Sequence, residues 1–381
     1  MFLNLIKNEI NNRLEVIKKV KTQNKKIMLY GAGVRAQMLT DFLRAYNIEV
    51  SGYIVDNQYY KEGMQLFGKK IYRFSDVCEN LGECIVLIAF QNYERASSII
   101  KNAVNTEIYY IDDPYDFYKM DYDYILKNDR LFAESYNMMS DELSKQIFTA
   151  FINGKISDSP EELCSLRNTD GYQYDYRLLG LGDNEVIVDC GAYTGDTIKD
   201  ILSYTGGKYN KIFAFEPDSK NCEEMRCNIP EKNIKIINKG VWHSSDVLKF
   251  HSSKSTASSF NEYSDGVMSD YINEEDLIVS VPVTSIDEEL SGEDVTLIKM
   301  DIEGSELSAL MGAEKIIKRC FPKLAICVYH RVDDFITIPQ YIRSLSSDKI
   351  RYKFYMRHHA AWMAETVLYA IPESVSGDIN E

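Results

Sequence analysis

Residues 185–197 read EVIVDCGAYTGDT, and this stretch decides the fold of the C-terminal half. A buried strand ends at Asp189, a glycine turn follows, and a helix begins near Asp196. Gly191 and Gly195 let the backbone turn sharply and let a ligand approach without a Cβ in the way, while the helix start offers free N–H groups. We therefore predict a ligand site here, in which Asp189 holds a ligand ammonium directly or through a nearby amide or water.

A second acidic position ends the next predicted strand, FAFEPD at 213–218. A carboxylate at Glu216 can accept two hydrogen bonds from a ribose diol, as in dinucleotide-binding sheets. The phosphate-binding pattern GxGxxG is absent from this half of the sequence, and Asp196 and Glu216 together would repel a pyrophosphate. These residues favour S-adenosylmethionine, whose adenosine, ammonium and positive sulfonium suit an acidic site.

A third acidic segment, KMDIEGSE at 299–306, follows the apolar run VTLIKM. Strand-end carboxylates of an open parallel sheet face the ligand crevice, so we predict Asp301 beside the reacting centre. Glu303 is a further catalytic candidate, although Glu303 and Glu306 also suit first-turn charges that stabilise a helix dipole. His330 ends the next strand, LAICVYH, and is a candidate general base or substrate contact, with a structural role as the alternative.

A divalent metal held by Asp301 and neighbouring carboxylates is a second way to activate a hydroxyl group. The five histidines show no metal-ligand spacing, and the carboxylates define no clear ligand set. We therefore assign no metal ligand.

The whole chain shows two alternating patterns of strands and helices, which predicts an α/β protein with two doubly wound sheets joined by helices. An amphipathic helix is expected at 1–24, a small Rossmann-like sheet at 25–113 and a tyrosine-rich helical connector at 114–175. The second sheet domain is expected at 176–373 and a short tail at 374–381.

The N-terminal half carries its own motif, GAGVRA, between a predicted strand and a predicted helix. Gly31, Gly33 and Ala36 match the GxGxxA fingerprint of dinucleotide sites, and Asp56 ends the next predicted strand, where such sites hold a ribose. Nucleotide or nucleotide-sugar binding, a degenerate scaffold or dimerisation domain, and NAD binding all remain open. The Tyr/Lys pair of a sugar dehydrogenase is not found.

The composition of the chain excludes several classes of protein. The 381 residues carry 43 Lys+Arg against 58 Asp+Glu, a net charge of −15, which argues against nucleic acid or an anionic membrane surface as a partner. No apolar run reaches the roughly 20 residues of a membrane span, and the N-terminus does not resemble a signal peptide. The eight cysteines form no CxxC pair, as in a reducing compartment. We expect a cytoplasmic protein, with the N-terminal helix and sheet as surfaces for a homodimer.

Five ordered segments resemble the FkbM family of S-adenosylmethionine-dependent methyltransferases, over roughly residues 170–372. They are VIVDCGAYTGDT, FAFEPD, VPVTSIDEEL, LIKMDIEGSELSALMGAEKIIK and RHHAAWMAETVLYAIP. The resemblance implies a class I methyltransferase sheet whose final antiparallel strand, TVLYAIP, lies beside YKFYMRHH. It also implies O-methylation of a hydroxyl, commonly on sugars or polyketide-type products.

The resemblance also implies roles for residues by position. The methionine part of the cofactor would contact Asp189, Gly191, Ala192, Tyr193, Gly195, Asp196 and Thr197. Glu216 would hold the ribose, Pro217 and Asp218 would flank the adenosine, Lys239, Gly240 and Val241 would lie near the adenine, and Asp301 would lie beside the methyl group. The N-terminal segment resembles the small domain that precedes acyltransferase domains in some sugar-modifying enzymes, where it binds a nucleotide-sugar.

The sequence thus predicts an enzyme that transfers a methyl group from S-adenosylmethionine to a hydroxyl of a sugar, glycan or nucleotide-sugar-linked acceptor. In this mechanism His330 or Asp301 removes the proton, and His358 and His359 close over the acceptor. A nucleotide-sugar oxidoreductase or epimerase built on the N-terminal motif is one alternative. The other is a module that binds S-adenosylmethionine without turnover.

Overall fold

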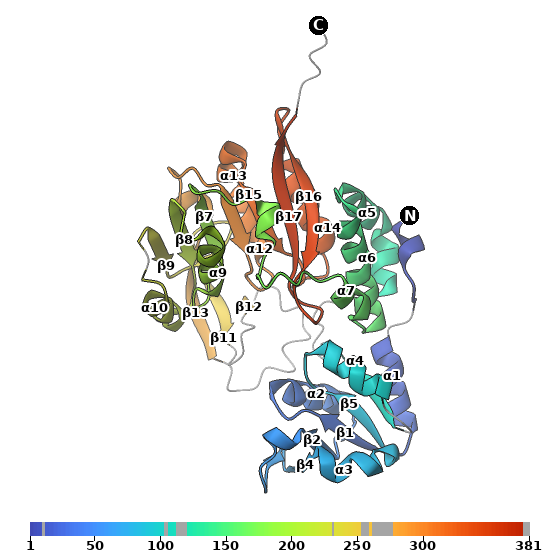
Figure 1. Ribbon diagram of the computed structural model, residues 1–381. Helices are drawn as coiled ribbons and strands as arrows, with labels where there is room; N and C mark the ends of the chain where they lie inside the picture. Colours follow the sequence, from blue (N-terminus) through green and yellow to red (C-terminus); the bar gives the residue numbers. More distant parts are fainter. Residues whose placement is uncertain are drawn as a thin grey trace. The chain divides into compact units, whose positions relative to one another are not determined.

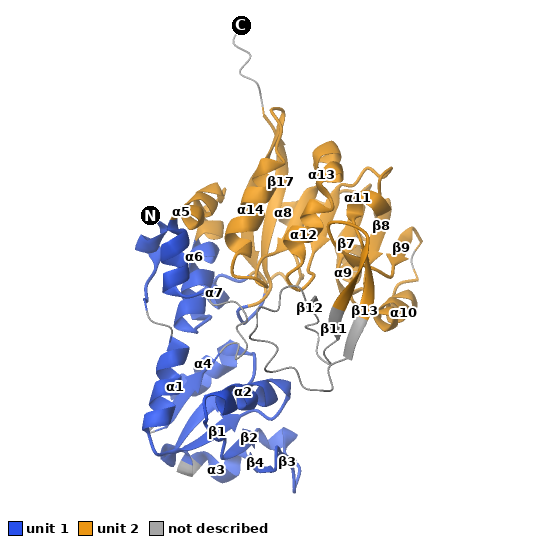
Figure 2. Cartoon of the chain, turned by 180° about the vertical axis from the view of Figure 1, so that it is seen from behind, with its two compact units in different colours: residues 1–129, 146–167, 360–363 blue, residues 130–145, 168–359, 364–381 orange. Residues whose placement is uncertain are grey.

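The computed structural model describes residues 1–9, 12–102, 106–111, 120–230, 232–252, 259–260 and 277–375. Contacts group the chain into two compact units, drawn in different colours in Figure 2. Unit 1 comprises residues 1–129, 146–167 and 360–363, and unit 2 comprises 130–145, 168–359 and 364–381. The predicted boundary near 113 and nearly all of the predicted tail lie outside the described residues.

Unit 1 contains a six-stranded sheet in the order β3-β4-β2-β1-β5-β6 (Figure 1). Its strands are β1 (Lys26–Tyr30), β2 (Gly52–Val55), β3 (Gln65–Leu66), β4 (Lys69–Arg73), β5 (Cys84–Ile88) and β6 (Glu107–Tyr110). All pairings are parallel except that of β3 with β4. The parallel sheet expected within 25–113 is therefore present.

Helices cover both faces of this sheet because successive strand residues point to opposite sides. On one face, Ile27 and Leu29 of β1 pack with residues of α1 (Asn12–Thr22) and α2 (Val34–Ala45). On the other, Met28 and Tyr30 pack with part of α3 (Phe74–Val77) and with Ile99 of α4 (Tyr93–Asn102).

The single helix predicted for the first residues is wrong. A short 3-10 helix, η1 (Phe2–Leu5), precedes α1, and Ile6 between them is extended. The backbone N–H of Lys7 donates to Asn153 Oδ1 over 2.8 Å, so tertiary contact replaces the helical hydrogen bond here.

The predicted connector is helical, with α5 (Tyr122–Met138), α6 (Glu142–Ser157) and α7 (Glu161–Ser165). These helices do not form a separate body, since 130–145 group with unit 2 and 146–167 with unit 1.

Unit 2 contains a seven-stranded sheet in the order β16-β17-β15-β14-β7-β8-β9. Its strands are β7 (Val186–Cys190), β8 (Lys211–Phe215), β9 (Ile234–Ile237), β14 (Leu297–Met300), β15 (Lys323–Cys327), β16 (Ile350–His358) and β17 (Thr366–Ser374). Strand β17 runs antiparallel to both β15 and β16, which confirms the expected final antiparallel strand. Its helices are α8 (Tyr176–Leu179), α9 (Asp196–Thr205), α10 (Ser219–Asn228), α11 (Ile286–Glu289), α12 (Glu306–Met311), α13 (Glu314–Cys320) and α14 (Asp334–Ser344).

Both predicted sheets are present, and the structure adds a third sheet that was not predicted. Strands β10 (Gly240–Val241), β13 (Leu277–Thr284), β11 (Asp246–Ser252) and β12 (Ser259–Phe260) pair in that order. They bury an apolar cluster of their own, made of Trp242, Leu248, Val281 and Val283, and therefore do not extend the main sheet.

Within the described ranges, none of the helices combines the length and the apolarity that a bilayer span requires.

Candidate active site

The predicted site residues of unit 2 lie along one edge of the seven-stranded sheet. Strands β7, β8, β14 and β15 are parallel neighbours, so the residues that follow them, Glu216 and Asp301 among them, meet at their carboxyl ends. Strand β16 runs in the same direction as β15 because each is antiparallel to β17, and it ends at this edge with His358. The edge therefore collects the acidic segments that the sequence analysis identified.

The two glycines of the first turn make room for the protein chain. Gly191 has φ +76°, and a Cβ there would lie 1.9 Å from the backbone oxygen of Asp301. Gly195 has φ +86°, and a Cβ there would lie 2.2 Å from Ile229 Cδ1. The expectation that these glycines clear space for a ligand is wrong, because protein atoms fill that space.

The rest of the turn combines buried and exposed groups. The N–H groups of Gly191 and Ala192 both donate to the carbonyl of Phe215 over 3.0 Å, which fixes the turn on β8. Tyr193, with φ +45°, is 44% exposed and is strained for a residue with a Cβ. Asp196 at the start of α9 is exposed. Asp196 is thus open to a ligand.

Thr197 connects this turn to the connector segment. Its side chain is buried, and its hydroxyl donates to Gln173 Oε1 over 2.9 Å. Close by, Tyr174 is buried, and its hydroxyl contacts the Sγ atom of Cys327 at the end of β15. Sequence reasoning did not assign Gln173 or Tyr174 to the site. The dense tyrosines at 172–176 were the available signal.

Asp189 is fully buried and is paired with the protein's own ammonium. Lys299 Nζ lies 2.9 Å from Asp189 Oδ1 and donates to the carbonyl of Gly191 over 2.9 Å. Burial raises the pKa of Asp189, against the opposing effect of Lys299. The predicted direct contact of Asp189 with a ligand ammonium is therefore wrong, because Lys299 occupies that position.

Glu216 lies where a ribose-binding carboxylate was predicted and is only 6% exposed. Its Oε1 accepts hydrogen bonds from Asp218 N (2.9 Å) and Asn221 Nδ2 (3.2 Å), and its Oε2 accepts one from Tyr193 N (3.0 Å). Burial raises the pKa of Glu216. A carboxylate has about four acceptor positions, so Oε2 retains capacity for one hydroxyl.

The residues predicted near the adenine are fixed by other parts of unit 2. Asn238 Nδ2 donates to the carbonyls of Glu216 and Pro217, both over 2.9 Å, and sequence reasoning missed this contact. Lys239 pairs with Glu289 over 3.1 Å. Gly240 and Val241 form β10, with the Val241 side chain buried.

Around His330 the structure brings three carboxylates together. His330 Nδ1 lies 2.8 Å from Glu306 Oε1, and Nε2 lies 3.4 Å from Asp301 Oδ1 and 3.6 Å from Glu303 Oε2. Tyr329 also donates its hydroxyl to Asp301 Oδ1 over 3.1 Å.

The charge state of this cluster bears on the predicted general base. Burial by itself would lower the pKa of His330, but the carboxylates of Glu306 and Glu303 outweigh it, and Asp301 adds to them, so that the pKa rises to about 10. Such an imidazole already carries its proton at neutral pH. The environment therefore argues against His330 as a general base.

His358 and His359 do not form a mobile cover over the site. His358 is fully buried, and its Nδ1 lies 2.9 Å from the hydroxyl of Thr366. His359 Nε2 lies 3.0 Å from the hydroxyl of Tyr369, and burial lowers the pKa of His359 to about 4. The prediction that these residues close over the acceptor is wrong, because each is bonded to β17.

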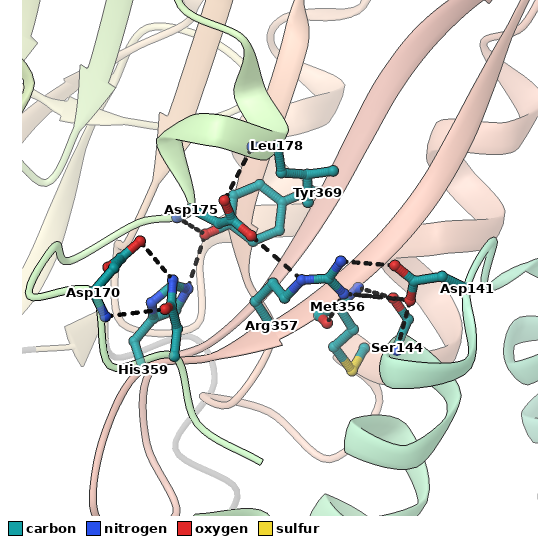
Figure 3. A network of polar contacts seen from close by, with 10 residues as sticks. Asp141, Ser144, Asp170, Asp175, Leu178, Met356, Arg357, His359 and Tyr369 are labelled. Atoms are coloured by element: carbon teal, nitrogen blue, oxygen red, sulfur yellow. Dashed lines mark hydrogen bonds and ion pairs between the residues drawn. The ribbon is translucent and has the colours of Figure 1, made fainter. Parts of the chain in front are cut away.

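Arg357 of β16 links two acidic residues from distant segments, as Figure 3 shows. Its guanidinium contacts both carboxylate oxygens of Asp141, at 2.7 and 3.3 Å, and lies 3.4 Å from Asp175 Oδ2. Asp175 caps α8 by accepting from Leu178 N. This ion-pair network ties the start of α6 to the edge of the sheet.

We expect Asp141→Asn to lower the free energy of unfolding of unit 2 by about 1–2 kcal/mol, because it leaves the largely buried Arg357 with a weaker acceptor. Despite the opposing effect of burial, the hydrogen bonds from Arg357 lower the pKa of Asp141 in the folded protein. The stabilisation that the Asp141 carboxylate provides should therefore be complete above the ordinary carboxyl pKa of about 4. It should be lost progressively as the pH falls below that value.

Urea unfolding of wild type and variant at pH 7 and pH 3 measures this difference. The difference in free energy of unfolding between the two proteins should be smaller at pH 3 than at pH 7, and an equal difference at both values would refute the ion-pair explanation. Asp183→Asn, which removes an exposed partner of Lys208, is the control and should change little.

The N-terminal motif lies at the end of β1. Gly31 has φ +130°, and a Cβ there would lie 2.5 Å from the carbonyl oxygen of Ala89. Gly33 precedes α2 with open space around it, and Ala36 is buried. Asp56 Oδ1 accepts from Tyr30 over 2.6 Å, and Oδ2 pairs with Arg95. The structure thus shows protein partners on both oxygens of the predicted ribose ligand.

Comparison with known proteins identifies the domain that carries the site. Residues 189–365 match the methyltransferase FkbM domain. The crystal structure of methyltransferase FkbM from Methylobacillus flagellatus KT is similar with a TM-score of 0.74 and 22% identity, and the match covers 95% of this chain and 94% of that chain. This likeness extends the shared fold to nearly the whole chain. A search of curated proteins gave no match.

Two further solved structures match about half of this chain. One is an rRNA methylase from Streptococcus thermophilus, with a TM-score of 0.30, 15% identity, and coverage of 51% of this chain and 90% of that chain. The other is NSun6 from Pyrococcus horikoshii, solved with SFG, with a TM-score of 0.31, 12% identity, and coverage of 53% and 50%. Residues 189–365 thus match a methyltransferase domain of the FkbM type, and the chain is a methyltransferase.

Proposed function

We propose that the protein transfers a methyl group from S-adenosylmethionine to a hydroxyl of a sugar or glycan acceptor. The observation that carries this proposal is the acidic edge of the seven-stranded sheet, with Glu216 beside the turn at 191–197. The match of residues 189–365 to the FkbM domain supports the methyl-transfer class. All eight cysteines are free, which supports the cytoplasm as its location.

The donor groups at this edge suit the proposed cofactor. Glu216 Oε2 has room for a ribose hydroxyl, and Asp196 is exposed at the start of α9. Glu365 directly precedes β17. Its burial and the nearby carboxylates of Asp301 and Asp196 raise its pKa. Crowded carboxylates of this kind favour a ligand with positive charge and disfavour a pyrophosphate.

The chain's own residues must hold the acceptor and receive its proton. When bound, S-adenosylmethionine supplies a methyl carbon on a positively charged sulfur, which keeps the electron pair of the broken C–S bond. Asp301 comes directly after β14, and its Oδ1 is held by Tyr329. In this proposal Asp301 accepts the proton of the acceptor hydroxyl, and Asp301 and Glu303 together orient that hydroxyl.

The oxidoreductase alternative has less support. A ribose diol at the N-terminal motif would have to displace Tyr30 and Arg95 from Asp56. Calorimetry with S-adenosylmethionine, NAD and a UDP-sugar in parallel tests both functions. We expect heat of binding with S-adenosylmethionine, followed by transfer of a labelled methyl group to a glycan panel. Binding of NAD alone would overturn the proposal.

We expect Glu216→Gln to weaken binding of S-adenosylmethionine by about 10- to 100-fold, because a hydrogen bond to a charged group contributes roughly 1.5–3 kcal/mol. Glutamine can keep Oε1 as the acceptor for Asp218 N and Asn221, while its NH₂ group replaces Oε2, the acceptor for Tyr193 N and for the proposed ribose hydroxyl. Calorimetry measures the affinity. Glu223→Gln, on the exposed side of α10, is the control and should bind normally. Unchanged affinity in both variants would remove Glu216 from the ribose site.

A further inference from the structure

The imidazole of His330 leaves one nitrogen unsatisfied in a buried position. The His330 side chain is 8% exposed, and Nε2 makes no hydrogen bond to the described part of the chain. The nearest acidic atoms are Asp301 Oδ1 at 3.4 Å and Glu303 Oε2 at 3.6 Å, both beyond normal hydrogen-bond length. A buried polar atom of this kind, aimed between two carboxylates, indicates a missing partner.

Glu306 orients this imidazole from the opposite side. The Glu306 side chain is fully buried, and its Oε1 lies 2.8 Å from His330 Nδ1 and accepts from the backbone N–H of Ile302 over 2.9 Å. With Nδ1 engaged by Glu306, Nε2 is the nitrogen left for a cation, which would take the place of the proton that this imidazole otherwise carries on Nε2 at neutral pH. Histidines that bind metals nearly always have such a carboxylate, carbonyl or water on their other nitrogen.

The surrounding groups offer the remaining ligands. Asp301, Glu306 and His330 each bring a ligand-type atom within 4.8 Å of the others. Glu303 is held in the left-handed region, with φ +55°, and its partly exposed carboxylate lies on the Nε2 side of the ring. One imidazole among three carboxylates also leaves an excess of negative charge around the buried His330 ring, which a cation would neutralise.

We propose that His330 Nε2, Asp301 and Glu303 bind a divalent cation, with Glu306 as the positioning residue for His330. A mixed set of one nitrogen and carboxylate oxygens suits Mn²⁺ and related ions. The catalytic meaning of the site rests on the proposed function, since a cation there would lower the pKa of an acceptor hydroxyl near Asp301. The binding itself does not depend on the reaction.

The experiment titrates the full chain with Mn²⁺ alone and follows free Mn²⁺ by electron paramagnetic resonance. We expect one bound Mn²⁺ per chain, with a nitrogen coupling from the imidazole in the pulsed spectrum. His330→Ala should abolish that coupling and weaken binding by more than about 100-fold, since even outer partners of a metal ligand contribute 10- to 100-fold. Glu306→Gln should keep the coupling and weaken binding by about 10-fold.

Two controls make the outcome decisive. His243→Ala changes an exposed histidine bonded to Ser244 and should bind Mn²⁺ like wild type. Thermal unfolding shows whether each variant is folded. If His330→Ala does not fold, the nitrogen coupling of the wild-type protein still tests the site. Absence of bound Mn²⁺, or bound Mn²⁺ without nitrogen coupling, overturns the proposal. Binding of S-adenosylmethionine is measured separately, so its failure would reject the proposed function and leave the cation site standing.

Discussion

Replacing Gly191 by alanine should lower the free energy of unfolding of unit 2 by about 2–5 kcal/mol. The left-handed φ of +76° costs an alanine roughly 1–2 kcal/mol. The new Cβ would also lie 1.9 Å from the carbonyl oxygen of Asp301, and overpacking typically costs about 1–3 kcal/mol more. We expect a loss of stability near the upper end of this range, because the clashing atom is a backbone oxygen that no change of side-chain rotamer can move. Binding of S-adenosylmethionine should fall with it, since the turn and Asp301 would move apart.

Urea unfolding followed by the fluorescence of Trp242 measures this effect. Trp242 is buried in unit 2, and Trp362→Phe removes the other tryptophan of the chain. Gly206→Ala is the matched control, because Gly206 also has a positive φ, +64°, but a Cβ there meets nothing within 4 Å. It should cost only about 1 kcal/mol. If both variants lost the same free energy of unfolding, the close approach of Gly191 to Asp301 would not explain the effect of Gly191→Ala.

Replacing Lys299 by methionine should cost about 3–5 kcal/mol, because it leaves the Asp189 carboxylate buried without its partner. Both side chains are almost completely inaccessible, at 4% and 0% exposure. Methionine retains most of the apolar length of lysine, so the loss should come from charge and not from a cavity. The double variant Asp189→Asn, Lys299→Met should recover at least half of the loss, since no charge then remains buried.

The pH dependence gives a second measurement of the same pair. Burial already raises the pKa of Asp189 in the wild type, and loss of Lys299 should raise it further. A carboxyl whose pKa is higher in the folded state binds its proton more tightly there, so Lys299→Met should be more stable at low pH and lose stability as the pH rises above about 4. Unfolding in urea at pH 4 and pH 7 tests this. A pH-independent loss would show that Asp189 is not charged in the wild type.

Much of the fold could be predicted because its signals are local. The apolar run that ends at Asp189 and the glycine turn after it specify a strand feeding a helix, and the same holds for the run that ends at Tyr30. The third sheet could not be predicted. Strands β11 and β13 have the same β-forming composition as the strands of the main sheet, and pairing decides which sheet a strand joins.

The location of the site could be predicted better than its contacts. Glu216, Asp301 and His330 follow parallel strands, so their meeting at one edge is a consequence of topology. Gln173 and Tyr174 were missed because they come from a segment without strand or helix periodicity, and only tertiary contact brings them to Thr197 and Cys327.

The sequence by itself determined the order of strands and turns, and with it the edge where the acidic residues gather, because backbone periodicity and glycine turns act over a few neighbouring residues. Only the tertiary structure decided which of these groups already have partners. Lys299 holds Asp189, Arg95 holds Asp56, and three carboxylates surround His330. These pairings depend on the register between strands and loops that are distant in the chain, and charge interactions reach whichever group that register places within a few ångströms.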